Sequence, residues 1–482
     1  MEAALLFGIA VGFDLLGDWR GIPQVFAGNL FNPDSYIRLV RIEAGLRAGQ
    51  IGYAIPRGGF VLHWSHLLDS ILLAAAAPLV PWLGWHRALF WVGAASGPVG
   101  VGLLAIAVAW ATAPLAEPGM RWWAGVAVGV APGIGAYGRL GVIHHHVLLV
   151  LVAVMVAGWS FRAAAGWRGA AVPAGAWFAF GLWLTPETWP FGLLSLGAIG
   201  VGWIAGNEGT ARALTVAGAT LGSLVLAVLL VDPPPGRAVA FDHVSVVHLG
   251  LAATIAALGA GLAGIDRLRL GAAGRAGAGA ALAVALLGVW AALFPRALLG
   301  PAGMTASPGA AVMLASVSEM RPASPPAFAI ALLLGGAFGV AASAWVARRE
   351  RSWLALYGAL CGLVIFVLGA RYMRFAPYGE ALGAAMLPVV LSAIGAVKRV
   401  GLLALVLFVP RIAPSFAPVQ QAGPGCALAD VAGRLAPDAG EIVLASADLT
   451  PELLYRTGVR TVGGLYLRDV PGFLRLRAAW DA

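Results

Sequence analysis

Charged residues are scarce in this chain: only 11% of its 482 residues are Asp, Glu, Lys or Arg, whereas 60% are hydrophobic. This balance excludes a soluble globular protein of this size and indicates a polytopic membrane protein. Cysteine is nearly absent, so the sequence has neither a disulfide framework nor a cysteine-based metal site. The net charge of +9 does not indicate nucleic acid as a partner, because the arginines lie in short loops between apolar stretches.

Apolar stretches recur along most of the chain, and we interpret thirteen of them as helices that span a lipid bilayer. A span needs about 20 apolar residues, and fewer when it packs inside protein. The first stretch has neither a basic segment before it nor a cleavage site, so we expect a retained helix rather than a signal peptide. The stretches cover residues 3–16, 88–113, 122–137, 147–161, 169–185, 190–206, 213–231, 248–265, 276–294, 326–347, 353–370, 376–394 and 400–413.

Basic residues gather in alternate loops and predict which loops are cytoplasmic. These residues are Arg162, Arg168, Arg212, Arg267, Arg269, Arg275, Arg348, Arg349, Arg351, Lys398 and Arg399. Residues 66–84 are apolar enough to cross, but a crossing there would move every later basic cluster outside. We therefore expect residues 66–84 to form a helix at the outer interface. The unusual polar residues then share the opposite, outer face, and we expect an active site that faces the extracytoplasmic side.

Two outer loops carry isolated carboxylates. Asp34 follows the first span directly, where a carboxylate can reach the membrane surface or cap a helix. Arg38 lies on the same segment and is an additional candidate. The other loop, 295–325, carries Glu319, and a loop of this length between hydrophobic helices is usually functional.

Three consecutive histidines precede the fourth span. They cannot all face one way on a helix, so His144 and His146 are expected to converge, with His145 as an additional candidate. Neutral imidazoles ligate transition metals, and His63 and His66 could supplement them. Hydrogen bonds from the histidines to the loop backbone are the alternative interpretation.

Three further charged residues lie at the ends of later spans. Glu187, in a tight loop, can cap the following helix or take part in a site. Arg371 and Arg374 are basic residues on the outer face, against the bias that places such residues inside. Two guanidinium groups at the membrane surface suit a phosphate or pyrophosphate group, whereas snorkelling toward lipid headgroups is the alternative.

These features in this order resemble the catalytic subunits of oligosaccharyltransferases, membrane enzymes of the GT-C class. That family has thirteen spans and a long outer loop between the ninth and tenth, with a short motif that Ser316-Val317-Ser318-Glu319 reproduces in the expected loop. The resemblance implies an all-α polytopic GT-C fold for residues 1–414, with functional outer loops at 17–87 and 295–325. For residues 415–482 we expect a small extracytoplasmic α/β domain, with strands at 441–445 and 461–466 and a helix at 450–456.

The resemblance also implies a divalent cation. In the family, acidic residues of the first outer loop and of a motif before the fourth span bind that cation. Asp34 resembles the first group, whereas His144 and His146 stand where the acids of the second belong. The implied ligands are Asp34, His144, His146 and Glu319. Mg²⁺ prefers oxygen ligands, whereas a set with histidines favours Mn²⁺, Zn²⁺ or no metal. Arg371 or Arg374 resembles the family arginine that holds the lipid-linked phosphate.

The activity that the resemblance implies is transfer of a sugar or oligosaccharide from a polyprenyl-(pyro)phosphate carrier to an extracytoplasmic glycan, lipid or protein, with inversion. Asp34 and Glu319 would be its catalytic residues. The family's acceptor motif Trp-Trp-Asp-Tyr-Gly is absent, so asparagine glycosylation is not implied. One alternative is a monosaccharide transferase that uses a polyprenyl-monophosphate donor. A transporter or flippase is another, but it predicts polar residues at mid-membrane and internal repeats.

Overall fold

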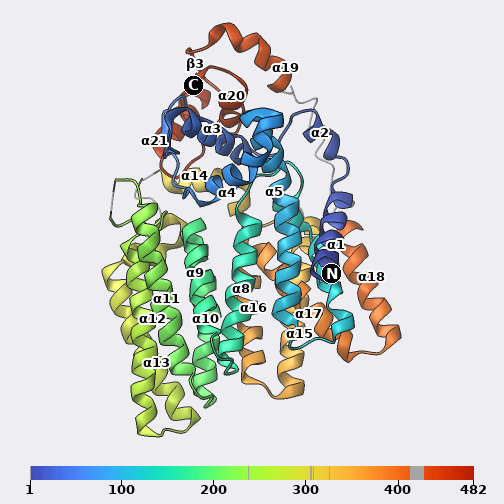
Figure 1. Cartoon of the computed structure of the whole chain (residues 1–482), viewed down its shortest axis with the longest axis vertical. Coiled ribbons are helices and arrows are strands. Elements are labelled where there is room, and N and C mark those ends of the chain that lie inside the picture. Colours follow the sequence, from blue (N-terminus) through green and yellow to red (C-terminus); the bar gives the residue numbers. More distant parts are fainter. Residues whose placement is uncertain are drawn as a thin grey trace.

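Long helices stand side by side in a bundle, and shorter elements form a cap at one end of it in the computed structural model (Figure 1). The structure describes residues 2–236, 238–303, 307, 309–324, 326–412 and 428–481. Within these ranges, eight helical segments are long and apolar enough to cross a membrane, the longest being Leu67–Thr112. The chain is therefore a multi-pass helical membrane protein, as its composition predicts.

Each of the thirteen predicted stretches falls on helix, although the number of membrane crossings stays a prediction. The stretch at 122–137 is two helices rather than one, because the backbone is extended at Ala131 (φ −69°, ψ 119°). Pro132 then opens the second helix at a position that needs no amide donor. The bundle helices are α1 (Glu2–Gly17), α5 (Val80–Thr112), α6 (Trp122–Val130), α7 (Pro132–Gly138), α8 (His146–Ala164), α9 (Ala171–Leu184), α10 (Trp189–Ile204), α11 (Thr210–Val231), α12 (Val246–Ile265), α13 (Ala272–Leu293), α15 (Pro326–Glu350), α16 (Trp353–Arg371), α17 (Ala376–Ala393) and α18 (Ala396–Ile412).

Small residues allow the bundle helices to approach closely, as is common in lipid. A Cβ atom at Gly383 of α17 would lie 2.3 Å from the carbonyl oxygen of Gly335 of α15. A buried carboxylate, Glu380, adds a polar link between α17 and α7. Its two oxygens accept the backbone N–H groups of Gly133 and Ile134, each at 2.8 Å. This link satisfies two donors at the start of α7 that have no partner within the helix.

The cap consists of short helices and two small sheets: α2 (Ile22–Phe26), α3 (Pro33–Ala48), β1 (Ala54–Ile55), β2 (Phe60–Val61), α4 (Leu67–Ala76), α14 (Ala310–Ser316), α19 (Leu428–Ala432), β3 (Ile442–Val443), α20 (Thr450–Arg456), β4 (Arg460–Thr461) and α21 (Val470–Asp481). Strand β1 pairs antiparallel with β2, and β3 pairs parallel with β4. The predicted strand at 461–466 is thus shorter and begins earlier. The predicted domain boundary at 414/415 lies outside the described residues.

Residues 66–84 leave the cap and enter the bundle. Helix α4 lies in the cap beside α3 (Figure 1), and a 3₁₀ turn, Ala77–Leu79, joins it to α5. The helix geometry of α5 breaks at Gly84 (φ 70°, ψ 163°). The nearby Trp82 is 79% exposed, as expected for an indole at a membrane–water interface. Whether residues 66–84 lie at the membrane interface stays a prediction, because the segment Leu67–Thr112 as a whole is also long and apolar enough to cross.

The basic connections lie at the end of the bundle away from the cap. The turns between α12 and α13 and between α15 and α16 are at that end (Figure 1), and the side chains of Arg267, Arg348 and Arg349 are exposed there. The cap and the basic turns therefore mark opposite ends of the molecule, as the alternation of the loops predicts.

Candidate active site

A cavity of about 330 Å³ lies where the cap meets the bundle. Its wall combines residues from the start of α3, the loop before α4, the end of α7, the start of α8, the loops after α9 and α14, the turn before α17, and the C-terminal segment. The polar and aromatic residues that line it are Asn32, Asp34, His63, Trp64, Tyr137, His144, His145, His146, Thr185, Glu187, Ser316, Ser318, Glu319, Arg374, Asp448 and Tyr466. The structure thus brings the residues singled out from the sequence together, except Arg38, His66 and Arg371.

The first turn of α3 places Asp34 at the cavity. The Asn32 side chain caps this helix by accepting the backbone N–H of Ser35 at 2.7 Å. Ser35 Oγ in turn accepts the backbone N–H of Ile143 at 2.8 Å, which ties α3 to the histidine segment. The capping role considered for Asp34 therefore belongs to Asn32, and the Asp34 carboxylate faces His144.

Hydrogen bonds link the arginine on one side of the cavity to the carboxylate on the other. Arg374 Nη2 lies 3.0 Å from His146 Nε2, and His144 Nε2 lies 2.9 Å from Asp34 Oδ2. The Nδ1 atoms of the two histidines contact each other. Because arginine can only donate, His146 Nε2 accepts, and the two imidazoles then donate in turn toward Asp34. Both rings are neutral in this arrangement, and Asp34 is the final acceptor.

Two carboxylates hold Arg374 in place. Its Nη2 atom lies 2.7 Å from Glu187 Oε2, and its Nη1 atom lies 3.7 Å from Glu319 Oε1. The other oxygen of Glu319 accepts a hydrogen bond from the Tyr137 hydroxyl group at 2.7 Å. Tyr137 also stacks on His146, with ring centroids 4.4 Å apart. Glu319 and Glu187 therefore act on the same guanidinium group, and Tyr137 connects Glu319 to the histidines.

The surroundings shift the pKa values of the carboxylates in opposite directions. Burial raises the pKa of Glu187 and outweighs the opposing effect of Arg374. Burial also acts to raise the pKa of Glu319, but Arg374, His144 and the Tyr137 hydroxyl outweigh it and lower that pKa. Burial lowers the pKa of His63 to about 4. The closer carboxylate, Glu187, is thus the one whose charged form burial disfavours, and the His63 imidazole is uncharged at neutral pH.

The donor atoms present fit a divalent cation of the borderline type. The imidazoles of His144, His145 and His146 each offer a nitrogen within 4.8 Å of the others, and Asp34 adds a carboxylate oxygen beside them. Nitrogen donors suit Mn²⁺ or Zn²⁺ better than Mg²⁺. Glu319 contacts Tyr137 and Arg374 instead, so its role as a metal ligand stays a prediction.

Three of the residues singled out from the sequence lie away from the cavity. The exposed Arg371 is the last residue of α16, and its guanidinium group lies over the Tyr372 ring at 4.8 Å. Arg38 is buried and donates to Asp69 at 2.5 Å. His66 contacts a carboxylate of the α11–α12 loop, as described below.

The sequence interpretation missed Tyr137 and two residues of the C-terminal segment, Asp448 and Tyr466. A tyrosine at the end of an apolar stretch is a typical interfacial residue and was a usable signal for Tyr137. No local pattern distinguishes Asp448, which reaches the cavity through tertiary packing. Burial, followed by the charge of Asp34, raises the pKa of Asp448, and both carboxylates line the cavity.

An apolar groove of about 250 Å³ runs along the bundle next to the cavity, lined by residues of α5, α8, α10, α15, α16 and α17. Phe191 and Tyr378 form part of its wall and stack on each other with centroids 4.0 Å apart. Phe191 also packs on Phe375, the residue after Arg374, at 5.7 Å. The groove therefore comes close to the arginine of the cavity.

No protein-family model and no curated protein matches the sequence. Solved structures do match the fold. The oligosaccharyltransferase AglB from Archaeoglobus fulgidus, in complex with an inhibitory peptide and a dolichol-phosphate, superposes with a TM-score of 0.75 at 16% identity and covers 96% of this chain. Structures of the Archaeoglobus fulgidus oligosaccharyltransferase with Zn and sulfate, and tethered to an acceptor peptide containing the NVT sequon, give TM-scores of 0.72 and 0.68, at 16% and 15% identity and 96% coverage of this chain.

This chain spans 64%, 62% and 64% of the length of the chains in those three structures. The match therefore covers nearly all of this chain but leaves a third or more of each archaeal chain without a counterpart. The chain has the oligosaccharyltransferase-like fold that its outer-loop motif predicts.

Proposed function

We propose that this protein is a membrane glycosyltransferase that moves a sugar or oligosaccharide from a polyprenyl-(pyro)phosphate carrier to an extracytoplasmic acceptor. The observation that carries the proposal is the placement of Asp34 and Arg374 at opposite ends of one hydrogen-bonded chain in a single cavity. A carboxylate can take a proton from the acceptor, and a guanidinium group can stabilise a leaving phosphate. The neighbouring apolar groove has the character required by a polyprenyl chain.

The transfer step uses these two residues as follows. Asp34 accepts the proton of the acceptor nucleophile, which forms a bond to the anomeric carbon of the donor sugar. The bond between that carbon and the phosphate oxygen breaks, and both of its electrons stay on the phosphate. Arg374 stabilises this charge. Attack from the side opposite the phosphate gives inversion at the anomeric carbon.

Fixed orientation makes Arg374 suitable for this role. Its contacts with Glu187, Glu319 and His146 hold the guanidinium group before the donor arrives, so no reorganisation is needed during transfer. Removing one of the carboxylates would leave the cation freer and would also change the charge that faces the phosphate.

The charges around the cavity favour a bound cation. Among the described residues, four carboxylates and one arginine line the cavity, so acidic groups outnumber basic ones. The carboxylates are Asp34, Glu187, Glu319 and Asp448, and the arginine is Arg374. A donor phosphate would add further negative charge. Asp34, His144 and His146 would hold a divalent cation in place of the hydrogen bonds that join these three residues, with Glu319 as a further ligand. When bound, such an ion would supply Lewis-acid stabilisation of the leaving phosphate.

The position of the basic turns supports an extracytoplasmic site. Arg348 and Arg349 lie at the end of the bundle away from the cavity, and cytoplasmic loops carry an excess of such residues. We therefore place the cavity on the periplasmic side of a bacterial inner membrane. The archaeal enzyme of the same fold was solved with a dolichol-phosphate and, separately, with an acceptor peptide. By analogy the partners here would be a polyprenyl-linked donor and an extracytoplasmic glycan, lipid or protein.

A transfer assay tests the proposal. The purified protein, in liposomes, is given polyprenyl-linked monosaccharides with a labelled sugar, together with donor-depleted membranes as the acceptor source. We expect label to move from the lipid carrier to a membrane component, and to stay on the carrier with Asp34→Ala. Equal transfer by Asp34→Ala, or label that never leaves any carrier offered, would contradict the proposal.

A polyprenyl-monophosphate donor is the second candidate, and the position of Arg371 favours it. Two outward arginines suit a pyrophosphate, but in the described part of the chain only Arg374 lines the cavity. Binding of polyprenyl phosphate and of polyprenyl pyrophosphate to the same protein distinguishes the two. Equal or tighter binding of the monophosphate would support the monosaccharide transferase, whereas a preference for the pyrophosphate of tenfold or more would exclude it.

A further inference from the structure

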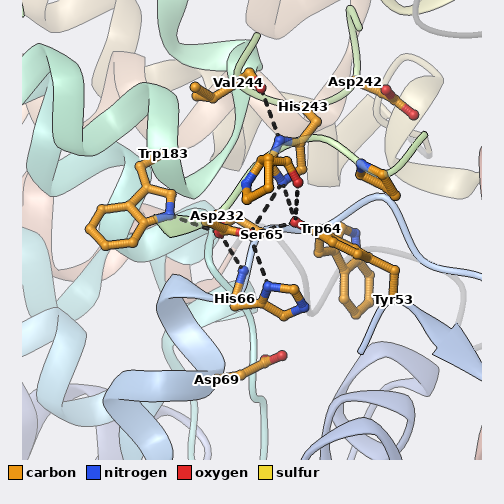
Figure 2. Close-up of polar contacts among 12 residues, drawn as sticks. Tyr53, Trp64, Ser65, His66, Asp69, Trp183, Asp232, Asp242, His243 and Val244 are labelled. Carbon is orange, nitrogen blue, oxygen red and sulfur yellow. Dashed lines mark hydrogen bonds and ion pairs between the residues drawn. The ribbon is translucent and has the colours of Figure 1, made fainter. Parts of the chain in front are cut away.

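A buried carboxylate outside the cavity, Asp232, joins the loop between α3 and α4 to the bundle. It directly follows α11 and is 3% exposed. Its oxygens accept the indole N–H of Trp183 at 2.8 Å, the backbone N–H of His66 at 2.9 Å and His66 Nδ1–H at 2.8 Å. The Tyr53 hydroxyl also donates to it. Figure 2 shows the side chains of Trp183, His66 and His243 arranged around this carboxylate.

This position would be unfavourable for an aspartate without these donors. The C-terminal end of a helix carries partial negative charge, and a buried carboxylate loses its hydration. Burial acts to raise the pKa of Asp232, but the hydrogen bonds from His66, Tyr53 and Trp183 outweigh it and hold the pKa well below its usual range. The carboxylate is therefore charged, and these donors satisfy both of its oxygens. The other ring nitrogen of His66, Nε2, is buried without a hydrogen-bond partner among the described residues.

The network ends on a short strap, residues 63–66, that forms part of the cavity wall. His63 and Trp64 line the cavity, whereas the carbonyl groups of Trp64 and Ser65 accept hydrogen bonds from the buried Arg41 at 2.9 and 3.0 Å. His66, the last residue of the strap, is the one held by Asp232. Arg41 and Asp232 thus fix the strap from two sides.

The strap lies on the side of the cavity that carries Asp34. The guanidinium group of Arg38, one helical turn after Asp34 on α3, lies over the Trp64 ring at 4.6 Å. The Trp64 and Tyr466 rings meet edge to face at 5.7 Å. Arg374, which would hold the phosphate, lies at the other end of the chain of histidines. A movement of the strap would therefore alter the acceptor side of the cavity before the donor side.

We propose that Asp232 is a positioning residue, which holds His66 and so keeps residues 63–66 in the place that the acceptor requires. The inference rests on the proposed function, because it assigns the strap to the acceptor of that reaction. Misplacement of a reacting group by about 1 Å costs roughly a hundredfold in rate. We therefore expect Asp232→Asn, which turns two acceptor atoms into one acceptor and one donor, to lower kcat at least tenfold.

The chain offers a matched control at the other end of the bundle. Trp203 Nε1 donates to Asp266 Oδ1 at 2.8 Å, the same pair of groups at the same distance as Trp183 and Asp232. Asp266 is exposed at the turn after α12, and neither residue lines the cavity. Asp266→Asn and Trp203→Phe therefore report what loss of such a pair does when no strap depends on it.

Two measurements on the full-length protein in detergent test the inference. Hydrogen–deuterium exchange of the peptide covering residues 60–66 reports the strap directly, without any need for activity. Transfer kinetics with the labelled donor, and equilibrium binding of polyprenyl phosphate, report the two sides of the cavity. We expect Asp232→Asn to increase exchange at least tenfold and to lower kcat, with donor KM and polyprenyl phosphate binding within twofold of the unsubstituted protein.

Trp183→Phe removes one hydrogen-bond donor to Asp232, and we expect smaller changes in exchange and in kcat, in the same directions. This second variant keeps the test valid if Asp232→Asn does not fold. Unchanged exchange in residues 60–66 would overturn the inference. Faster exchange with a kcat equal to that of the Asp266→Asn control would also overturn it. A loss of polyprenyl phosphate binding as large as the loss of kcat would overturn it as well. If the unsubstituted protein transfers no sugar, the proposed function fails, and the exchange measurement alone decides whether Asp232 holds the strap.

Discussion

Replacement of Asp34 by asparagine separates proton transfer from folding. The amide oxygen of the introduced side chain can still accept His144 Nε2–H, which lies 2.9 Å from the native carboxylate, so the local hydrogen bond is retained. The carboxylate side chain is 32% exposed, and we expect a change in stability below about 1 kcal/mol. The variant cannot take a proton from the acceptor. General base catalysis contributes about 10²–10⁴-fold, or roughly 3–5 kcal/mol of the barrier, so we expect a fall in kcat of that size.

Initial rates of sugar transfer in liposomes measure this effect, with polyprenyl phosphate binding measured in parallel. Asp18→Asn is the control, because Asp18 is 30% exposed, pairs loosely with Arg139 at 3.9 Å and does not line the cavity. We expect the control to transfer at the rate of the unsubstituted protein. If Asp34→Asn transferred within threefold of the control, Asp34 would not be the base, and the chemistry proposed for the cavity would be wrong.

Three further predictions follow from the site and from the network around Asp232. Arg374→Ala should lower polyprenyl phosphate affinity at least tenfold, whereas Arg371→Ala should change it less than twofold; equal effects would contradict the assignment of the phosphate to Arg374. Chelation should slow transfer, and Mn²⁺ or Zn²⁺ should restore it better than Mg²⁺; full activity in the chelator would exclude a catalytic cation. Because the pKa of Asp232 is lowered on folding, its contribution to stability is present above its ordinary pKa of 3.8 and is lost as the pH falls through the folded value. The unfolding temperature should therefore decrease as the pH falls below about 4. The Asp232→Asn variant, which is less stable at neutral pH, should show a smaller decrease over the same pH interval. Parallel curves of unfolding temperature against pH for the two proteins would refute this.

Helix positions were predictable because the signal for them is local. Runs of apolar residues specify helices in lipid whatever their neighbours are, and the thirteen predicted stretches all fall on helix. The break at Ala131 was less visible, although Pro132 was a usable warning that a single helix could not continue. Short strands such as Arg460–Thr461 depend on pairing with a distant segment, and their bounds were accordingly poor.

The residues of the site could be predicted only in part. Helical spacing does not tell which side chains share a face when the helix ends between them. Arg371 and Arg374 are three residues apart and would share a face on one helix. The backbone is extended at Tyr372 (φ −137°, ψ 110°), so the two arginines lie on different elements, and only Arg374 turns into the cavity. Similarly, Asp69 belongs to the stretch 66–84 that was expected at the outer interface, but its side chain is buried against Arg38 and Arg41 of α3. Such pairings depend on the tertiary fold.

Asp232 illustrates a signal that was present in the sequence and not used. An aspartate that follows a long apolar helix and precedes three prolines lies where the helix dipole disfavours it. Such a residue requires donors from elsewhere in the chain, and the structure supplies Tyr53, His66 and Trp183. The identity of those donors could not be derived from spacing, because they come from segments that are distant in the sequence.

A structure of the protein with bound polyprenyl phosphate would show whether Arg374 holds the donor. We predict that the phosphate contacts Arg374 between Glu319 and the His144–His146 segment, and that the polyprenyl chain enters the groove lined by Phe191 and Tyr378. A phosphate bound at Arg371, or at the basic turns on the opposite end of the bundle, with this cavity free of lipid, would contradict it.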